Sequence, residues 1–207
     1  MATAVKICGI TTPGDARQAA HAGAHAVGLV FHPASARHVS PAQARAVVDA
    51  LPPFVMAVGL FVNAEPAEVA AVVSATGVQL LQFHGDESPA YCAAFGMPYI
   101  KAIRVRQGVD LLQCSRRFQG ARGLLLDAFH EQHHGGTGQQ FDWSLIPSGL
   151  ALPIVLAGGL TPDTVEQAVR RVRPWAVDVS SGVESSKGVK DPAKVAAFIR
   201  GARNADV

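Results

Sequence analysis

The sequence has little charge, few cysteines and no long apolar run, and each shortage excludes a class of protein. Charged residues make up 16% of the 207 residues, and the formal net charge of +2 comes without a block of Lys or Arg, so nothing indicates a nucleic-acid partner. No apolar run approaches the roughly 20 residues that a membrane-spanning helix needs. The first residues lead into a strand pattern without the basic segment of a signal peptide. We therefore expect a cytoplasmic protein that binds neither membrane nor nucleic acid.

The cysteines exclude two further kinds of protein. There are three of them, Cys8, Cys92 and Cys114, an odd number at wide spacing. Neither a disulfide framework nor a zinc site has this pattern. The adjacent His133 and His134 are weak evidence for a metal, and we interpret their glycine-rich loop as a mobile cover. The sequence therefore predicts no metal site.

What the chain does contain is a regular alternation of short apolar runs with amphipathic stretches. The apolar runs predict strands at 6–10, 26–31, 56–62, 79–84, 99–105, 123–129, 154–159 and 176–182. The stretches between them predict helices at 15–22, 41–51, 66–75, from about 88, 109–118, 161–171 and 192–203, with a short segment at 142–143. Because no break in composition divides these units, we expect one α/β domain over residues 1–207 with a parallel sheet.

Two architectures accommodate such a sheet, an open doubly wound sheet and a closed (β/α)8 barrel, or TIM barrel. Eight repeats in so short a chain, and polar residues at the ends of many strands, favour the barrel. In a barrel the carboxyl ends of all strands meet at one rim, where the active sites of this fold lie. We therefore expect polar strand-end residues to form one site.

The first predicted strand has an unusual composition for core. Side chains alternate along a strand, so Lys6 and Cys8 share one face, and we assign Ile7 and Ile10 to the other. Cys8 alone could be a small buried apolar group. A charge and a thiol on one face indicate instead that this strand contributes to a site.

Three other strand ends have an ionisable side chain: His84, Asp127 and Asp178. Each has a structural explanation on its own, since His84 could be a hydrogen-bonded rim residue and Asp178 could cap the following turn. Asp127 follows three leucines, where a carboxylate is costly unless it is paired or hydrogen-bonded. Because barrel closure would bring these residues together with Cys8, we interpret them as parts of one active site.

Glycine-rich turns end the seventh and eighth predicted strands, at Gly158-Gly159 and Ser181-Gly182. Glycine lets backbone N–H groups approach a ligand closely, and a following helix N-terminus favours anions. The loops after strands seven and eight are the usual phosphate site of the barrel. We therefore predict a small phosphorylated substrate, although the glycines could also serve tight turns only. Arg37, in the loop after the second strand, suits a carboxylate but could also be a solvated loop residue.

Short motifs extend this pattern over nearly the whole chain. They are Lys6–Ile10, Ser35-x-Arg37, Gln82–Glu87, Leu126–Ala128, Gly135–Gly138, Phe141–Trp143, Leu156–Leu160, Asp178–Glu184 and Gly188–Asp191. Together they resemble the phosphoribosylanthranilate isomerases, a family of tryptophan biosynthesis. The resemblance implies an aldose–ketose isomerase that needs no cofactor. Its reaction is the Amadori rearrangement of N-(5′-phosphoribosyl)anthranilate to 1-(2-carboxyphenylamino)-1-deoxyribulose 5-phosphate.

The resemblance also implies roles for individual residues. The general base falls on Cys8 and the general acid on Asp127, while Arg37 is placed to hold the anthranilate carboxylate. We expect Lys6 to lower the pKa of Cys8 and burial to raise the pKa of Asp127. The other substrate-binding candidates are Lys6, His84 and Asp178, and the phosphate-binding candidates are Gly158, Gly159, Ser181 and Gly182.

Other functions remain open at this stage. The histidine-pathway aminoaldose isomerases perform the same rearrangement on a similar barrel, but they have aspartate where Cys8 stands and usually show a two-fold repeat; an enzyme for both substrates is a related alternative. A phosphate-binding barrel without turnover, or a flavin or thiamine-phosphate barrel, would explain the glycine turns but not Cys8. The low charge and the lack of an obvious exposed apolar helix face favour a monomer over a homodimer.

Overall fold

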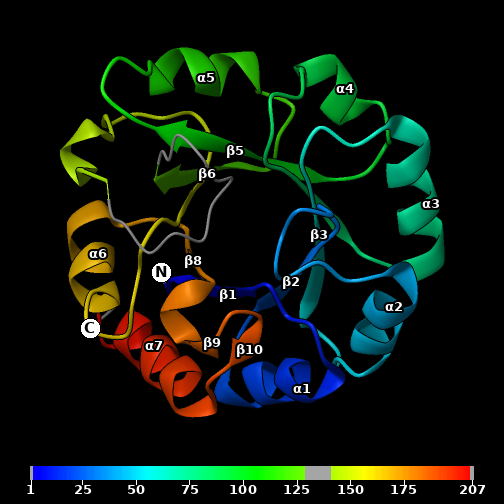
Figure 1. The fold of residues 1–207 in the computed structure, drawn as a ribbon. Coiled ribbons are helices and arrows are strands. Elements are labelled where there is room, and N and C mark those ends of the chain that lie inside the picture. The colour runs from blue at the N-terminus through cyan, green and yellow to red at the C-terminus, as the bar shows by residue number, and fades with distance from the viewer. Residues whose placement is uncertain (1, 129–140, 206–207) are drawn as a thin grey trace.

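Eight parallel strands form a closed barrel in which each strand pairs with its neighbours in sequence and β8 pairs with β1 (Figure 1). The computed structural model describes residues 2–128 and 141–205. The strands are β1 (Ala4–Cys8), β2 (Ala26–Val30), β3 (Met56–Phe61), β4 (Leu80–Phe83), β5 (Tyr99–Val105), β6 (Gly123–Ala128), β7 (Ile154–Leu156) and β8 (Ala176–Val179). This arrangement confirms the predicted (β/α)8 barrel and excludes the open doubly wound sheet.

Helices surround the barrel, and most of them begin where the sequence supplies a cap. They are α1 (Pro13–Ala22), α2 (Pro41–Asp49), α3 (Pro66–Thr76), α4 (Pro89–Ala93), α5 (Leu111–Arg117), α6 (Val165–Val172) and α7 (Pro192–Asn204). Ser40 caps α2, because its hydroxyl accepts from Gln43 N while the Gln43 side chain accepts from Ser40 N. None of the helices within the described ranges is long and apolar enough to cross a membrane.

Several strands end earlier than the apolar runs predicted. β7 stops at Leu156 because Gly158 and Gly159 both have positive φ angles, 81° and 66°, which turn the chain out of the sheet. After β8 the chain forms a short 3₁₀ turn, η2 (Ser181–Val183). It then forms a two-stranded antiparallel hairpin that the sequence did not predict, β9 (Glu184–Ser186) and β10 (Val189–Lys190).

One helix in the second half of the chain also departs from expectation. α6 begins at Val165, four residues later than predicted, after a turn in which the Thr164 hydroxyl accepts from Thr161 N. A 3₁₀ turn, η1 (Trp143–Leu145), occupies the predicted short segment. The glycine-rich loop that contains His133 and His134 lies outside the described residues.

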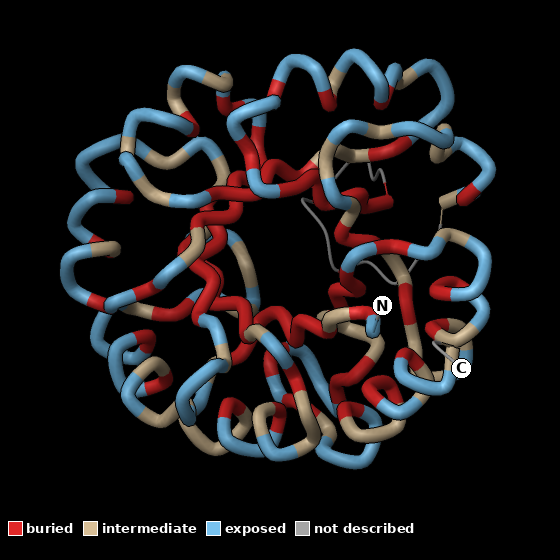
Figure 2. Tube along the Cα trace, turned by 180° about the vertical axis from the view of Figure 1, so that it is seen from behind, coloured by how far each residue is buried: buried red, intermediate tan, exposed pale blue. Residues whose placement is uncertain are grey.

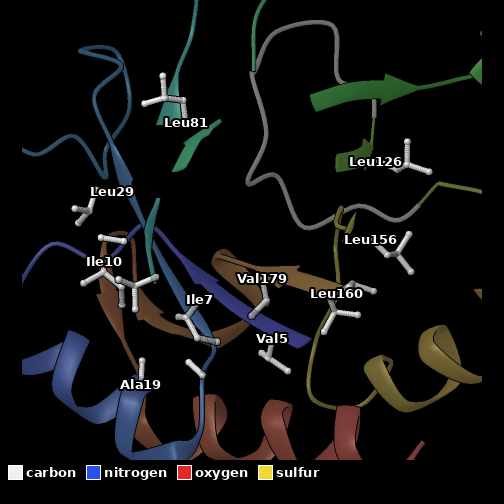
Figure 3. Packing of buried hydrophobic residues seen from close by; sticks show 14 of the residues in the cluster. Val5, Ile7, Ile10, Ala19, Leu29, Leu81, Leu126, Leu156, Leu160 and Val179 are labelled. Carbon is white, nitrogen blue, oxygen red and sulfur yellow. The ribbon is translucent and has the colours of Figure 1, made fainter. Parts of the chain in front are cut away.

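The main core lies between the barrel and its ring of helices, so the strands are buried and the outer helix faces are exposed (Figure 2). Val5 and Ile7 of β1 point toward the helices, and Ile10 joins the same cluster (Figure 3). The assignment of Ile7 and Ile10 to one face is therefore confirmed. Strict alternation would place Ile10 on the face of Cys8, but Gly9, with a φ angle of 74°, interrupts the alternation. The opposite face of β1 directs Lys6 and Cys8 into the barrel, where both are buried.

Candidate active site

A pocket opens where the carboxyl ends of the strands meet. It is lined by residues from the strand ends and loops around the barrel, and every predicted site residue except Lys6 is among them. Those residues are Cys8, Arg37, His84, Asp127, Gly158, Gly159, Asp178, Ser181 and Gly182. Barrel closure therefore brings together residues that are as far apart in sequence as Cys8 and Gly182.

Cys8 ends β1 and is only 5% exposed, with its sulfur against Gly28 of β2. A Cβ atom added to Gly28 would lie 2.7 Å from Sγ, so this glycine makes room for the thiol. Burial raises the pKa of Cys8, and Asp178 adds to the rise, while Lys6 and Lys190 oppose it. Lys6 therefore acts in the expected direction, but the net lowering of the Cys8 pKa that we expected is wrong, because burial outweighs Lys6.

Burial is the main reason, and the partner of Lys6 is a second one. Its ammonium group donates to Asp178 Oδ1 at 2.9 Å, across the directly paired strands β1 and β8. Burial alone would lower the pKa of Lys6, but Asp178 and Cys8 raise it to about 12. Because Asp178 compensates the positive charge, Lys6 cannot offset the burial of the thiol. Lys6 thus does not line the pocket itself, but it interacts with two residues that do, Asp178 and Cys8.

His84 and Asp127 form a hydrogen-bonded pair across the pocket. His84 Nε2 lies 3.1 Å from Asp127 Oδ2, and both side chains are buried. On its other side, the ring Nδ1 lies 3.0 Å from Gln82 Nε2. The second oxygen of Asp127, Oδ1, accepts from the backbone N–H of Ala128 at 2.9 Å. Both carboxylate oxygens of Asp127 are therefore hydrogen-bonded, which removes most of the cost of burying it after three leucines.

Arg37 is held by a carboxylate of the protein itself. Its Nε and Nη2 donate to the two oxygens of Glu184 at 2.7 and 2.8 Å, and the side chain crosses Gly9 so closely that a Cβ there would lie 2.4 Å from Arg37 Cδ. Glu184 also accepts from Lys190 Nζ at 2.8 Å. Arg37 is thus fixed beside Cys8 rather than solvated, with its Nη1 outside the bidentate contact.

The two glycine turns lie against each other at one side of the pocket. A Cβ atom on Gly158 would lie 2.6 Å from Ala128 N, and one on Gly182 would lie 2.0 Å from the carbonyl oxygen of Leu160, so neither position has room for a side chain. The buried hydroxyl of Ser180 lines the pocket and has no hydrogen-bond partner within the described residues. The helix expected directly after Gly159 begins only at Val165, so its N-terminus is farther from this turn than predicted.

Sequence reasoning missed four charged residues that support the site. Glu184 and Lys190 are the first and last residues of the hairpin β9–β10; Glu184 holds Arg37, and Lys190 donates to Glu184. Glu87 and Lys101 form a buried ion pair at 3.2 Å, and Lys101 Nζ also donates to the carbonyl oxygens of Phe83 and Gly85, on either side of His84. All but Lys101 belong to the motifs quoted above, but no pattern shows which partner each would reach. Among the described side chains, no group of three or more His, Cys, Asp or Glu residues is arranged to hold a metal.

Known proteins share this fold and sequence along almost the whole chain. The family model for N-(5'phosphoribosyl)anthranilate (PRA) isomerase matches residues 5–201. The N-(5'-phosphoribosyl)anthranilate isomerases of Nitrosospira multiformis and Thiobacillus denitrificans are 55% and 57% identical to the chain. The first alignment covers 97% of this chain and 97% of its relative, and the second covers 98% and 99%.

Two crystal structures extend the comparison to coordinates. Phosphoribosyl anthranilate isomerase from Thermotoga maritima has a TM-score of 0.90 at 41% identity, covering 98% of this chain and 99% of that one. A phosphoribosyl anthranilate isomerase in complex with reduced 1-(o-carboxyphenylamino)-1-deoxyribulose 5-phosphate has a TM-score of 0.83 at 37% identity, covering 98% and 99%. Given this agreement in sequence and fold, the chain belongs to the N-(5'-phosphoribosyl)anthranilate isomerase family.

Proposed function

We propose that the chain converts N-(5′-phosphoribosyl)anthranilate into 1-(2-carboxyphenylamino)-1-deoxyribulose 5-phosphate with Cys8 as base and Asp127 as acid. The observation that supports these roles is that a thiol from β1 and a carboxyl group from β6 line one pocket. Family membership supports the reaction, and a relative of known structure binds a reduced form of the product. The motifs of the histidine-pathway isomerases differ at Cys8, which favours the tryptophan-pathway substrate.

Asp127 acts first, by opening the sugar ring. In its protonated form it gives its proton to the furanose oxygen, the bond between that oxygen and C1′ breaks, and the anthranilate nitrogen lone pair forms the C1′=N bond of an iminium ion. Asp127 is left as a carboxylate. His84 and the N–H of Ala128 are placed to donate to that carboxylate, so they stabilise the charge that this step creates.

Cys8 acts second, on the hydrogen at C2′. The neighbouring iminium cation makes this hydrogen acidic, so a thiolate can remove it, and the electrons of the C–H bond form the double bond of an enolamine. The ketone then forms when the C2′ hydroxyl loses its proton to the Asp127 carboxylate and C1′ receives the proton from the Cys8 thiol. Both groups return to their starting states, and no electron is exchanged with a cofactor.

Binding is divided between the two ends of the substrate. Arg37 binds the anthranilate carboxylate with the edge of its guanidinium group that does not contact Glu184. The turns at Gly158-Gly159 and Ser181-Gly182, with the Ser180 hydroxyl, receive the phosphate. Asp178, held by Lys6, is placed to accept from a ribose hydroxyl. We place the enzyme in the cytoplasm, since a reducing compartment keeps Cys8 a free thiol.

The test follows the fluorescence of freshly prepared phosphoribosylanthranilate during incubation with the purified protein. The wild type should consume it faster than its spontaneous decay. Cys8→Ser and Asp127→Asn should each lower kcat by about a hundredfold or more with a smaller change in KM. Cys114→Ser is the matched control, because Cys114 on α5 is not among the residues that line the pocket, and it should keep wild-type kcat. Near wild-type kcat in both active-site variants would refute the assigned roles.

A further inference from the structure

The amide of Gln82 is a polar group of the pocket that the proposed reaction leaves without a task. Gln82 lies on β4, is fully buried and lines the pocket two residues before His84, on the same strand face. Its Nε2 lies 3.0 Å from His84 Nδ1. Its Oε1 is buried and has no hydrogen-bond partner within the part of the chain that the structure describes. A leucine would fill this place without burying an unpaired oxygen, so the amide calls for a chemical explanation.

The contact on Nδ1 determines where the histidine ring carries its proton. When Gln82 Nε2 donates to Nδ1, the neutral ring has its proton on Nε2, which then donates to Asp127 Oδ2 at 3.1 Å. Asp127 Oδ1 accepts from Ala128 N. This arrangement holds Asp127 as a carboxylate, which is its state after it has opened the substrate ring.

A protonated Asp127 requires the opposite pattern. A proton that arrives at Nδ1 makes an imidazolium, and the Nε2 proton can then move along the existing hydrogen bond to Asp127 Oδ2. The carboxylic acid now donates to Nε2, and the ring donates from Nδ1. Gln82 must then accept, which it does when its amide rotates by half a turn and presents Oε1. An amide has a donor and an acceptor on the same carbon, so it can pair with the ring in both states.

We infer that Gln82 is a positioning residue whose amide orientation follows the number of protons on the His84–Asp127 pair, and thereby lets Asp127 alternate between acid and carboxylate. This role rests on the proposed function of Asp127. The unpaired Oε1 is the acceptor that the two-proton state uses, and Nε2 is the donor that the one-proton state uses. His84 is the link between the amide and the acid.

Two variants separate this role from packing. Gln82→Met keeps the length of the side chain but removes the hydrogen-bonding ability of the amide. It should lower kcat about tenfold. KM should stay within about twofold of the wild-type value, since Arg37 and the glycine turns are unchanged. Gln82→Glu is nearly isosteric, but its carboxylate only accepts, so it should favour the two-proton state. The carboxylate should therefore keep His84 Nδ1 protonated to a higher pH than in the wild type.

The protonation readout is the nitrogen NMR spectrum of the histidine rings as a function of pH, with His84→Asn identifying the signals of His84. The other charged or titratable groups that line the pocket or lie beside the pair are unchanged in these variants; they are Cys8, His32, Arg37, Glu87, Lys101 and Asp178. We expect wild-type His84 to carry its proton on Nε2, Gln82→Met to show both ring forms, and Gln82→Glu to shift the Nδ1 titration upward by about one pH unit or more.

Unchanged ring signals in both variants, or a Gln82→Met enzyme with wild-type kcat, would overturn the inference. If Gln82→Met does not fold, Gln82→Glu alone decides, because its volume is that of the native residue. The NMR readout needs no turnover, so it distinguishes a failure of this inference from a failure of Asp127 as the acid. In the latter case Asp127→Asn would stay active while the ring signals still depended on residue 82.

Discussion

Replacing Glu184 with Gln should weaken both the fold and substrate binding, because this carboxylate joins Arg37 to Lys190. Its side chain is 5% exposed and that of Arg37 is 12% exposed, so the two charge-assisted hydrogen bonds at 2.7 and 2.8 Å are poorly screened by solvent. Gln keeps one acceptor, so the variant loses one bond of about 1.5–3 kcal/mol and leaves two buried cations less well compensated. We expect a loss of about 2–4 kcal/mol in unfolding free energy.

The loss is measured by denaturant unfolding and by thermal melting, where it should appear as a fall in Tm of about 4–16 °C. Because Arg37 would no longer be held in its bidentate contact, KM for phosphoribosylanthranilate should rise about three- to tenfold while kcat changes less. A matched control is Asp49→Asn, which breaks the exposed ion pair of Arg45 with Asp49 on α2 and should cost under about 0.5 kcal/mol.

The stability effect of Glu184 should also depend on pH. Burial alone would raise the pKa of Glu184, but hydrogen bonds from Arg37 and Lys190 hold it below its ordinary value. A carboxyl group whose pKa is lowered by folding contributes its stability above the pKa of the unfolded chain, about 4.3, and loses it as the pH falls through the folded value. Wild type and Glu184→Gln should therefore differ fully at neutral pH and converge below about pH 4. A difference that stays constant over this range would refute the assigned ion pair.

Three further substitutions test other supports of the site. Glu87→Gln should lower the unfolding free energy by about 3–5 kcal/mol, because it leaves the buried Lys101 ammonium without its carboxylate. Denaturant unfolding measures this loss, and a loss under about 1 kcal/mol would contradict the expectation. Arg37→Ala should raise KM about tenfold or more with a smaller effect on kcat in the fluorescence assay, and an unchanged KM would refute a role of Arg37 in substrate binding. Gly28→Ala places a Cβ 2.7 Å from the Cys8 sulfur, so kcat should fall about tenfold or more in steady-state kinetics, and wild-type kcat would show that the thiol position is not critical.

The barrel and the members of the pocket were accessible from the sequence because both depend on local order. Alternation along β1 is enough to place Lys6 and Cys8 on one face, and the position of a strand in the barrel is enough to bring Cys8 and Asp127 to one rim. Glycines mark where β7 ends. These conclusions use spacing within a segment and the ordinal place of that segment, which a sequence records directly.

The electrostatics of the pocket were less accessible because they depend on partners that only the fold brings together. The sequence shows Lys6 beside Cys8, but not that Asp178, 172 positions later, takes up its charge. Likewise Glu184 meets Arg37 only because the hairpin β9–β10 folds back over the loops at the start of the chain, where Thr11 donates to the carbonyl oxygen of Gly188. The predicted net direction for the Cys8 pKa failed because burial of the thiol outweighs the effect of Lys6, and Asp178 adds to the rise.

The raised pKa of Cys8 imposes an order on the proposed reaction. Two groups of ion pairs act on the thiol electrostatically. They are Lys6 with Asp178, and Arg37 and Lys190 with Glu184, and burial still outweighs their positive charge. Before substrate binds, the thiol is therefore mostly protonated at neutral pH, and the small thiolate fraction is a correspondingly stronger base. An iminium cation at C1′ is the charge that would stabilise this thiolate. In the proposed reaction, ring opening by Asp127 would then precede proton removal by Cys8, so the hydrogen bond between His84 and Asp127 would affect the second step as well as the first.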